Sequence, residues 1–202
     1  MVATPPRVGV LDLQGAGREH LRACERCGAL AVAVKRTQDL AGVDALVIPG
    51  GESTAIGRLM QEYGFLAALA GWDRPLFGTC AGLILLARQI NDSSQPRLGL
   101  MDLRVERNAF GRQRESFEAD LEVPVLGEAA FRAVFIRAPY IQEAGAGVQV
   151  LARFEGKIVL ARQGVFLAAA FHPELTDDLR LHRYFLSLLP WCQRLPDSPD
   201  ES

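Results

Sequence analysis

The sequence predicts an α/β protein with an open, mostly parallel sheet and an antiparallel extension. In the first half, short apolar segments alternate with segments whose apolar residues recur at helical spacing, which is typical of strands joined by helices. In the second half, strand-like segments follow one another across short turns. We find no repeat, linker or low-complexity segment, so we expect one domain over residues 1–190 and a flexible acidic tail over residues 191–202.

The predicted elements of the first half end at glycine or proline. Residues 8–13 form one apolar run, and residues 43–48 form another that stops at the proline and glycines of residues 49–51. Ser53 or Thr54 can cap the helix that follows this second strand. The remaining predicted elements of this half are helices over residues 18–28 and 81–88 and strands over residues 31–34 and 75–77.

Strand-like segments dominate the second half of the chain. Glu155 and Gly156, between two of them, are a tight hairpin signal, which favours antiparallel pairing. A final amphipathic helix is predicted over residues 176–189. The predicted strands cover residues 100–106, 115–123, 133–136, 148–154, 157–162 and 165–171.

Charge and cysteine content narrow the class of protein. The 22 basic and 24 acidic residues leave a net charge of −2, so nothing predicts a nucleic-acid or membrane partner. Four cysteines are few for a disulfide scaffold, and the first residues lack a charged segment followed by a long apolar one, so we expect a cytoplasmic protein. Cys24 and Cys27 form a single C-x-x-C inside a helical pattern, and we expect no metal site.

Cys80 stands between an apolar strand and an apolar helix, in the sequence GTCAG. A sharp turn of this kind lifts a nucleophile clear of the sheet, and the flanking glycines relieve its crowding. The start of the helix favours a thiolate, and the backbone N–H of Ala81 can face a developing oxyanion. The alternative is a buried structural cysteine beside glycines that are needed for packing.

A nucleophilic cysteine needs a base, and the sequence offers three histidines. His172 follows an apolar strand and precedes Pro173, and Glu174 stands two residues on. If the extended backbone continues, residues 172 and 174 point to the same side, and the carboxylate can hold the imidazole. The alternative is a strand end followed by a turn. His20 and His182 lie in predicted helices beside charged residues, and we expect both at the surface.

A glycine pair follows the predicted strand over residues 43–48, in the sequence IPGGEST. Glycines let backbone N–H groups approach a ligand closely, which suits an oxyanion hole with Gly51 as the main donor. Glu52 and Ser53 are polar groups placed to hold a substrate. The alternative is a plain loop between a strand and a helix; a phosphate-loop sequence does not occur here.

Together these motifs resemble those of class I, triad-type glutamine amidotransferases. Within that family the chain is similar to the glutaminase subunits of pyridoxal 5'-phosphate synthases, over residues 8–176. The matching segments, in order and spacing, are GVLDLQGAGREH, IPGGESTAIGRL, FGTCAGLILLA, ERNAFGRQRESFEADL, FIRAPYI and FHPELT. The resemblance implies a single-domain, flavodoxin-like three-layer sandwich around the mostly parallel sheet.

The resemblance also implies roles for individual residues. Cys80 would attack the carboxamide of L-glutamine, His172 would move the protons, and Glu174 would orient His172. Gly51 and Ala81 would supply the oxyanion N–H groups. The glutamyl thioester would then be hydrolysed to glutamate. The residues expected to contact glutamine are Gly51, Glu52, Ser53, Arg107, Ile136 and Arg137.

The resemblance further implies a partner. Ammonia would pass to a synthase (lyase) subunit that makes pyridoxal 5'-phosphate, a form of vitamin B6, from ribose 5-phosphate and glyceraldehyde 3-phosphate. The family pattern is twelve glutaminases on a dodecameric synthase, and Gln14, after the first strand, would face that synthase. No metal or organic cofactor is implied. Three alternatives stay open: a triad glutaminase that serves another synthase, a cysteine hydrolase or peptidase on a related fold, and a non-enzymatic binding subunit.

Overall fold

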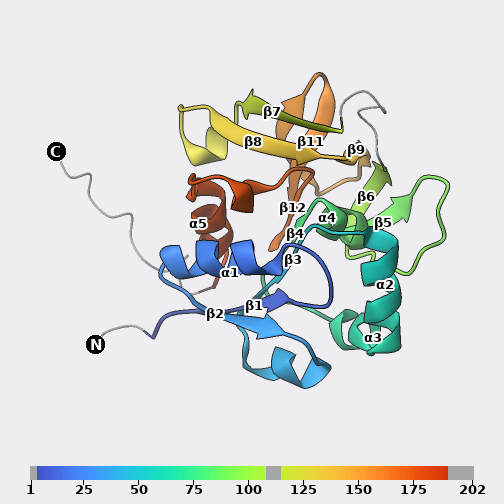
Figure 1. The fold of residues 1–202 in the computed structure, drawn as a ribbon. Coiled ribbons are helices and arrows are strands. Elements are labelled where there is room, and N and C mark those ends of the chain that lie inside the picture. Colours follow the sequence, from blue (N-terminus) through green and yellow to red (C-terminus); the bar gives the residue numbers. More distant parts are fainter. Residues whose placement is uncertain (1–3, 108–114, 191–202) are drawn as a thin grey trace.

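A curved mixed sheet runs through the molecule, with helices packed against it (Figure 1). The computed structural model describes residues 4–107 and 115–190. In sheet order the strands are β2 (Leu30–Val34), β1 (Arg7–Leu11), β3 (Ala45–Ile48), β4 (Leu76–Thr79), β12 (Phe166–Ala169), β11 (Lys157–Gln163), β9 (Tyr140–Ala144), β6 (Met101–Glu106) and β5 (Ala87–Ile90), and β10 (Gln149–Phe154) pairs with β11.

The five strands from β2 to β12 are parallel, which confirms the predicted parallel sheet. Strands β3 and β4 read ALVI and LFGT, and every residue in them is buried. Central strands that are covered on both faces need such continuous apolar runs. The carboxyl ends of β1, β3 and β4 meet at one edge of the sheet, so the segments that follow them, with Gln14, Gly50 and Cys80, lie together there.

Helices cover both faces of this sheet. They are α1 (Gly17–Arg26), α2 (Ser53–Glu62), α3 (Phe65–Leu69), α4 (Ala81–Leu86) and α5 (Arg180–Ser187). In β4, the ring of Phe77 lies 6.2 Å from that of His20 in α1 and 5.4 Å from that of Phe185 in α5. A Cβ on the next residue, Gly78, would instead meet Gly82 of α4 at 2.6 Å. Because successive residues of a strand face opposite sides, α4 lies opposite α1 and α5, and the predicted three-layer sandwich is confirmed.

The antiparallel extension is confirmed, but the sequence does not predict two of its strands. Strand β9 joins β11 to β6, and β5 follows α4 directly. The helix predicted over residues 81–88 therefore ends at Leu86. It ends there because the carbonyl of Leu85 accepts the N–H of Leu98 at 2.8 Å, so a loop distant in sequence takes a bond that would continue the helix.

The predicted strands over residues 115–123 and 133–136 are present, but they do not join the main sheet. They form a separate antiparallel ribbon of β7 (Ser116–Leu121) and β8 (Phe131–Ile136). Along β7, exposed residues alternate with half-buried ones, so the ribbon has one apolar face. The ring of Phe117 stacks on those of Phe135 at 4.7 Å and Phe154 of β10 at 5.3 Å, which packs that face onto the main sheet.

The last predicted helix is shorter than expected. Residues 176–189 contain α5 (Arg180–Ser187), preceded by a 3₁₀ turn at Pro173–Leu175. Between the two, Asp178 accepts the backbone N–H of Arg180 at 3.0 Å, which fixes the start of α5. The predicted tail, residues 191–202, lies outside the described residues, and the domain boundary at residue 190 stays a prediction.

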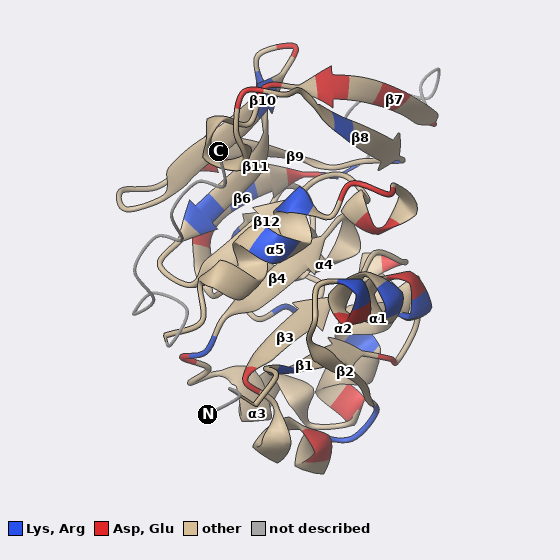
Figure 2. Ribbon diagram, turned by 90° about the vertical axis from the view of Figure 1, so that its left-hand side faces the viewer, with Lys and Arg blue, Asp and Glu red and all other residues tan. Residues whose placement is uncertain are grey.

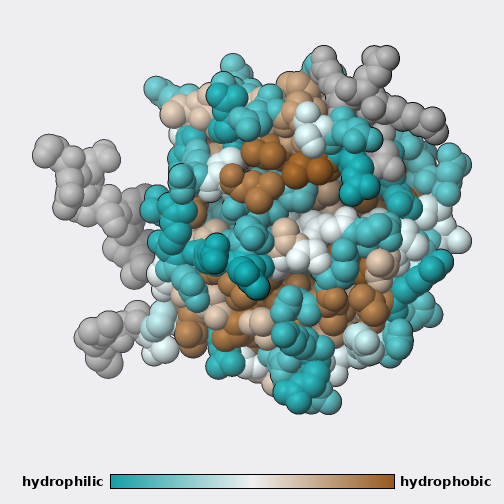
Figure 3. All heavy atoms as spheres, viewed as in Figure 1, coloured by the Kyte–Doolittle hydropathy of each residue, from teal (hydrophilic) through white to brown (hydrophobic). Residues whose placement is uncertain are grey.

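The central strands β3 and β4 carry no charged residue, whereas the helix α5 and the ribbon of β7 and β8 do (Figure 2). On the face drawn in Figure 3, hydrophobic residues form small separate groups between hydrophilic ones. Among the described residues, every helix is too short or too polar to cross a lipid bilayer.

Candidate active site

The glycines beside Cys80 lie where β3, β4 and α4 pack closely against one another. A Cβ on Gly82 would collide with the carbonyl oxygen of Ile48 in β3, and one on Gly78 would collide with Gly82. Between them Cys80 has φ 49° and ψ −101°, a conformation that costs energy for any residue with a side chain. Close packing of β4 on α4 thus forces the chain through a strained turn, and that turn presents the sulfur at the carboxyl edge of the sheet.

His172 and Glu174 are paired as the sequence predicts, although for a different local reason. Nδ1 of His172 lies 2.7 Å from Oε1 of Glu174, and both residues are buried. From the sequence we expect extended backbone through Pro173, but the chain instead forms the 3₁₀ turn Pro173–Leu175. The tightness of this turn, and not strand alternation, brings the carboxylate back to the imidazole.

The electrostatics of this pair favour an imidazolium next to a carboxylate. Burial lowers the pKa of His172, but hydrogen bonds with Cys80 and Glu174 outweigh it and raise that pKa to about 10. Burial raises the pKa of Glu174, but its contact with His20 and its hydrogen bond with His172 bring it below its usual value. A protonated His172 beside Cys80 favours the thiolate form of the nucleophile.

Cys80 and His172 line one open cavity of about 330 Å³. Almost every residue that the sequence assigns to the site lies on its wall. The lining residues with such an assignment are Gln14, Gly51, Glu52, Ser53, Cys80, Ala81, Arg107, Ile136, Arg137 and His172. Glu174 does not line the cavity, because it lies behind the ring of His172.

The glycine pair brings the loop after β3 against the nucleophile and its base. A Cβ on Gly50 would collide with the imidazole of His172 and would lie 3.4 Å from Cβ of Cys80. The carbonyl of Gly50 accepts the N–H of Ala16 at 3.1 Å, and Oε1 of Gln14 accepts the N–H of Glu52 at 3.0 Å. The segment after β1 therefore holds the peptide between Gly50 and Gly51 from one side.

Glu52 caps α2, a role that the sequence suggests for Ser53 or Thr54. Its carboxylate accepts the N–H of Thr54 at 3.0 Å and of Ala55 at 2.7 Å, and it also lies 3.5 Å from the guanidinium of Arg107. The prediction is wrong because an acidic side chain at this position reaches both free N–H groups. Ser53 is buried and donates its hydroxyl to another buried residue, Gln95.

Gln95 is a site residue that sequence reasoning misses. Its Oε1 accepts hydrogen bonds from Nη1 of Arg107 at 3.0 Å and from the hydroxyls of Ser53 and Thr54 at 3.3 and 3.2 Å. It thereby ties the guanidinium to the start of α2. Its position in a loop without regular pattern carries no signal that could have revealed this role.

The segment FIRAPY also turns sharply at the cavity. The thiol of Cys80 donates to the carbonyl of Ile136 at 3.8 Å, a distance suited to sulfur. Arg137 has φ 42°, which is uncommon for a residue other than glycine, and its N–H donates to the carbonyl of Glu115 at 2.6 Å. Backbone strain thus occurs both at the nucleophile and in the segment that faces it.

The expectation that His20 and His182 lie at the surface is wrong, because both are fully buried behind the triad. Nε2 of His20 lies 3.3 Å from Oε2 of Glu174 and 3.0 Å from the hydroxyl of Thr79. The missed signal is helical spacing: His182 stands three residues after Leu179 and four before Leu186, on the apolar face of α5.

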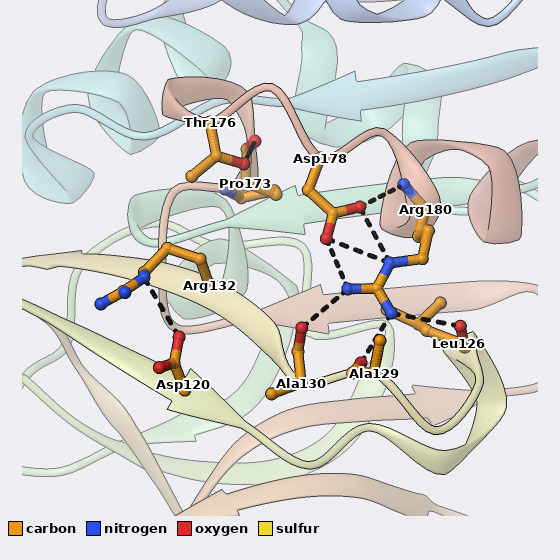
Figure 4. A network of polar contacts seen from close by, with 9 residues as sticks. All are labelled: Asp120, Leu126, Ala129, Ala130, Arg132, Pro173, Thr176, Asp178 and Arg180. Atoms are coloured by element: carbon orange, nitrogen blue, oxygen red, sulfur yellow. Dashed lines mark hydrogen bonds and ion pairs between the residues drawn. The ribbon is translucent and has the colours of Figure 1, made fainter.

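A polar network supports the segment that carries Glu174 (Figure 4). Arg180 forms an ion pair with Asp178 and donates to the carbonyls of Leu126, Ala129 and Ala130, at 3.4, 2.7 and 2.8 Å. These bonds fasten the loop before β8 to the start of α5, a few residues after the 3₁₀ turn. The described residues contain no group of three or more His, Cys, Asp or Glu side chains arranged to hold a metal ion.

Comparison with known proteins assigns the family. A sequence model of the SNO glutamine amidotransferase family matches residues 10–189. The pyridoxal 5'-phosphate synthase subunit PdxT of Pelotomaculum thermopropionicum is 67% identical over 183 residues, which cover 89% of this chain and 93% of the relative. PdxT of Moorella thermoacetica is 58% identical over 186 residues, or 91% of this chain and 99% of that one.

Solved structures agree with this assignment. The crystal structure of a glutamine amidotransferase with 54% sequence identity superposes with a TM-score of 0.85 and covers 90% of this chain and 98% of its own. A putative GMP synthase subunit from Thermoplasma acidophilum, at 16% identity and a TM-score of 0.67, shares the fold. The chain belongs to the SNO glutamine amidotransferase family.

Proposed function

We propose that this chain hydrolyses L-glutamine to L-glutamate and ammonia and delivers the ammonia to a partner subunit that makes pyridoxal 5'-phosphate. The observation that carries the reaction is the placement of Cys80, on a strained turn, in one cavity with His172, whose other ring nitrogen is held by Glu174. The pathway is inferred from the relatives, which are named as pyridoxal 5'-phosphate synthase subunits. The starting sugars would be ribose 5-phosphate and glyceraldehyde 3-phosphate.

In the first step, Sγ of Cys80 attacks the carboxamide carbon of glutamine, after its proton has passed to Nε2 of His172. The raised pKa of His172 favours this transfer, and Glu174 keeps Nδ1 protonated and the ring in place. His172 then gives its proton to the amide nitrogen. The C–N bond breaks, ammonia leaves, and a γ-glutamyl thioester remains on Cys80.

In the second step, water replaces ammonia beside His172. The imidazole takes a proton from the water as its oxygen attacks the thioester carbon. The C–S bond breaks, glutamate leaves, and the proton returns to the Cys80–His172 pair. Protons and bonds balance over the two steps, so neither a metal nor an organic cofactor is needed.

Charge develops on the carbonyl oxygen in both steps. Ala81 follows Cys80 at the start of α4, so its N–H is a suitable oxyanion donor. Gly51 is the second proposed donor, since its peptide lies on the cavity wall close to His172. This donor depends on the orientation of a single peptide plane.

The charged groups of the cavity suit the amino-acid end of glutamine. Arg107 offers a planar guanidinium for the α-carboxylate, and Gln95 holds it in place. Glu52, about half-exposed at its side chain, suits the α-ammonium group. The strained turn after Ile136 gives backbone groups of that segment, and the side chain of Arg137, access to the same ligand.

Gln14 links the proposed partner surface to the oxyanion peptide. Gln14 and Ala16 hold the loop of Gly50 and Glu52 through two hydrogen bonds. A synthase subunit bound at this edge would therefore act on the Gly51 donor through Gln14, which would restrain glutamine hydrolysis until an acceptor is present. We propose twelve such glutaminases on a dodecameric synthase, following the family pattern. The alternative is a glutaminase of the same chemistry that serves another synthase.

The described cysteines Cys24, Cys27 and Cys80 are free thiols, in keeping with the cytoplasmic location that we propose. Burial raises the pKa of Cys24 to about 12, so that thiol does not compete with Cys80 as a nucleophile.

The test is glutamate release from glutamine by the purified chain, alone and with a purified pyridoxal 5'-phosphate synthase (lyase) subunit. We expect strong stimulation by the partner and loss of the activity in Cys80→Ala. Formation of pyridoxal 5'-phosphate from glutamine, but not from glutamate, identifies the pathway. Absence of hydrolysis from a folded chain in the assembled complex would overturn the proposal.

A further inference from the structure

Glu174 has a second contact that the proposed reaction does not use. Its Oε1 faces His172, and its Oε2 lies 3.3 Å from Nε2 of His20, in α1. Both side chains of this rear contact are completely buried. On the other side of the His20 ring, Nδ1 lies 3.1 Å from Nε2 of His182, in α5. A chain of polar groups thus runs from the triad into the layer between α1 and α5.

The geometry decides which ring nitrogens carry protons. An unprotonated Nε2 of His20 would place its lone pair 3.3 Å from the carboxylate of Glu174, so Nε2 carries the hydrogen. This N–H is hydrogen-bonded to the hydroxyl of Thr79 at 3.0 Å and lies beside Oε2 of Glu174, which has no hydrogen bond of its own. Burial lowers the pKa of His20 below its usual value, which keeps the ring neutral. Nδ1 is then an acceptor, and its donor is Nε2–H of His182.

We propose that His20 is a positioning residue: through its Nε2–H it holds the rear oxygen of Glu174, while His182 fixes the tautomer in which it does so. This inference rests on the proposed glutaminase reaction. His20 does not touch the reacting atoms. It acts through Glu174 on the imidazole of His172.

A neutral donor suits this place better than a cation. Glu174 must stay ionised while His172 gains and loses a proton, and it must not take that proton itself. The N–H dipole beside Oε2 stabilises the carboxylate and, unlike a full charge, leaves its attraction for the imidazolium of His172 intact. Oε2 has no hydrogen bond of its own in the structure, so the N–H dipole of His20 beside it is the contact that stabilises its charge. Loss of this N–H would raise the pKa of Glu174.

The surroundings of the pair contain few other charges. Glu174 is faced by His172 from its own segment and by His20 from α1. His20 is faced in turn by His182 from α5, and Glu19 on its own helix acts on it more weakly. From β4, the groups beside this cluster are the Thr79 hydroxyl and the Cys80 thiol. A shift in the acid limb of a pH profile therefore reports on Glu174 and its two histidine contacts.

Two substitutions separate the contact with Glu174 from simple filling of space. His20→Gln places its amide nitrogen close to the position of Nε2 and keeps a donor for Glu174. His20→Asn is shorter, and its amide reaches only the position of Nδ1. Both would be measured as full chains in complex with the synthase subunit, with kcat/KM for glutamine determined from pH 5 to 9, and thermal melting used to check folding.

We expect His20→Asn to lower kcat by about 3- to 10-fold, because it removes a polar contact weaker than a full hydrogen bond to a charge. The acid limb of the kcat/KM profile, where activity falls with decreasing pH, should move to higher pH. His20→Gln should recover most of the rate and the wild-type limb. Equal profiles for wild type and His20→Asn, or equal losses in the Asn and Gln variants, would overturn the proposal.

A second readout does not need glutaminase activity. Iodoacetamide alkylates Cys80 at a rate proportional to the fraction of thiolate–imidazolium pair. The pH below which this alkylation rate falls should also be higher in His20→Asn than in wild type. If wild type does not hydrolyse glutamine, the proposed function is wrong. The pH dependence of Cys80 alkylation would still test the role of His20. If His20→Asn does not fold, His182→Leu should move the alkylation limb in the same direction, and an unmoved limb would contradict the proposal.

Discussion

The two oxygens of the Glu174 carboxylate meet very different surroundings. Oε1 faces His172 and, beyond it, an open cavity whose walls carry Arg107, Glu52 and strained backbone. Oε2 faces His20, in a closed layer between α1 and α5 where every polar partner is buried. The open side has room for a ligand and for moving protons, whereas the closed side can only hold the carboxylate still.

This difference separates chemistry from positioning. Substitutions on the open side should change the rate of glutamine hydrolysis with little effect on unfolding. Substitutions on the closed side should change pH dependence or stability, and should affect the rate only through the placement of Glu174.

Cys80→Ala removes the nucleophile of the open side. We expect glutamate release to fall by about 10⁴-fold or more, while the melting temperature stays the same or rises, because the strained turn carries a smaller side chain. Cys27→Ala, which removes a half-buried thiol far from the cavity, is the matched control and should keep wild-type activity. A Cys80→Ala enzyme that retains a tenth of the activity would exclude the covalent mechanism.

Glu174→Gln tests the shared carboxylate itself. The variant keeps the shape of the side chain but removes the charge that favours the imidazolium, so the pKa of His172 should fall. We expect kcat to drop by about 10²- to 10⁴-fold, the range seen when such an orienting carboxylate is made neutral. Glu143→Gln, at an exposed ion pair with Arg104, is the control. Comparable rates in the two variants would contradict the assigned role of Glu174.

Arg180→Ala tests the support of the catalytic segment shown in Figure 4. It leaves three backbone carbonyls without their donor, and we expect a loss of about 1–3 kcal/mol of unfolding free energy in urea denaturation. Arg132→Ala removes an exposed pair with Asp120 in the same view, and its cost should stay within about 0.5 kcal/mol. Equal costs for the two substitutions would show that the Arg180 network adds no stability.

His182→Leu tests the closed side through acid stability. Burial lowers the pKa of His182 to about 3, so the unfolded chain binds a proton below pH 6.5 that the folded chain does not. Wild type therefore loses stability as the pH falls through this window, and the variant lacks this loss. Between pH 7 and pH 5.5, the unfolding free energy of the variant relative to that of wild type should rise by about 1 kcal/mol, measured by denaturation at both pH values. A constant difference would mean that His182 is protonated in the folded state.

Most of the open side could be predicted from the sequence, with Gln95 as the exception, and the closed side could not. The motifs around Cys80, Gly51 and His172 are local, and each places its residue at the end of a strand by short-range geometry. The contact between His20 and Glu174 joins residues far apart in the chain, and it depends on how α1 and α5 pack over Phe77. Polar neighbours in the sequence suggest exposure, although helical spacing places both histidines inward.

The same distinction explains the errors in the fold. Strand β9 overlaps a segment interpreted as part of the site, and β5 (ARQI) begins inside the predicted helix over residues 81–88 and has too few apolar residues to indicate a strand. The pairing of Glu174 with His172 was predicted from strand alternation, whereas a 3₁₀ turn produces it. For β5 and β9, pairing with residues distant in the sequence decides the backbone conformation, whereas the turn after His172 is held by local bonds such as that from the N–H of Leu175 to the carbonyl of His172.

Covalent reaction of Cys80 with the side chain of glutamine can be followed by labelling with a reactive analogue. A chloroketone analogue of glutamine would be added to the complex with the synthase subunit, and the modified peptide would be identified by mass spectrometry. We predict one label per chain, on Cys80, slowed by excess glutamine and absent in Cys80→Ala. A label that forms on Cys24 or Cys27 instead, or that glutamine does not slow, would contradict the account.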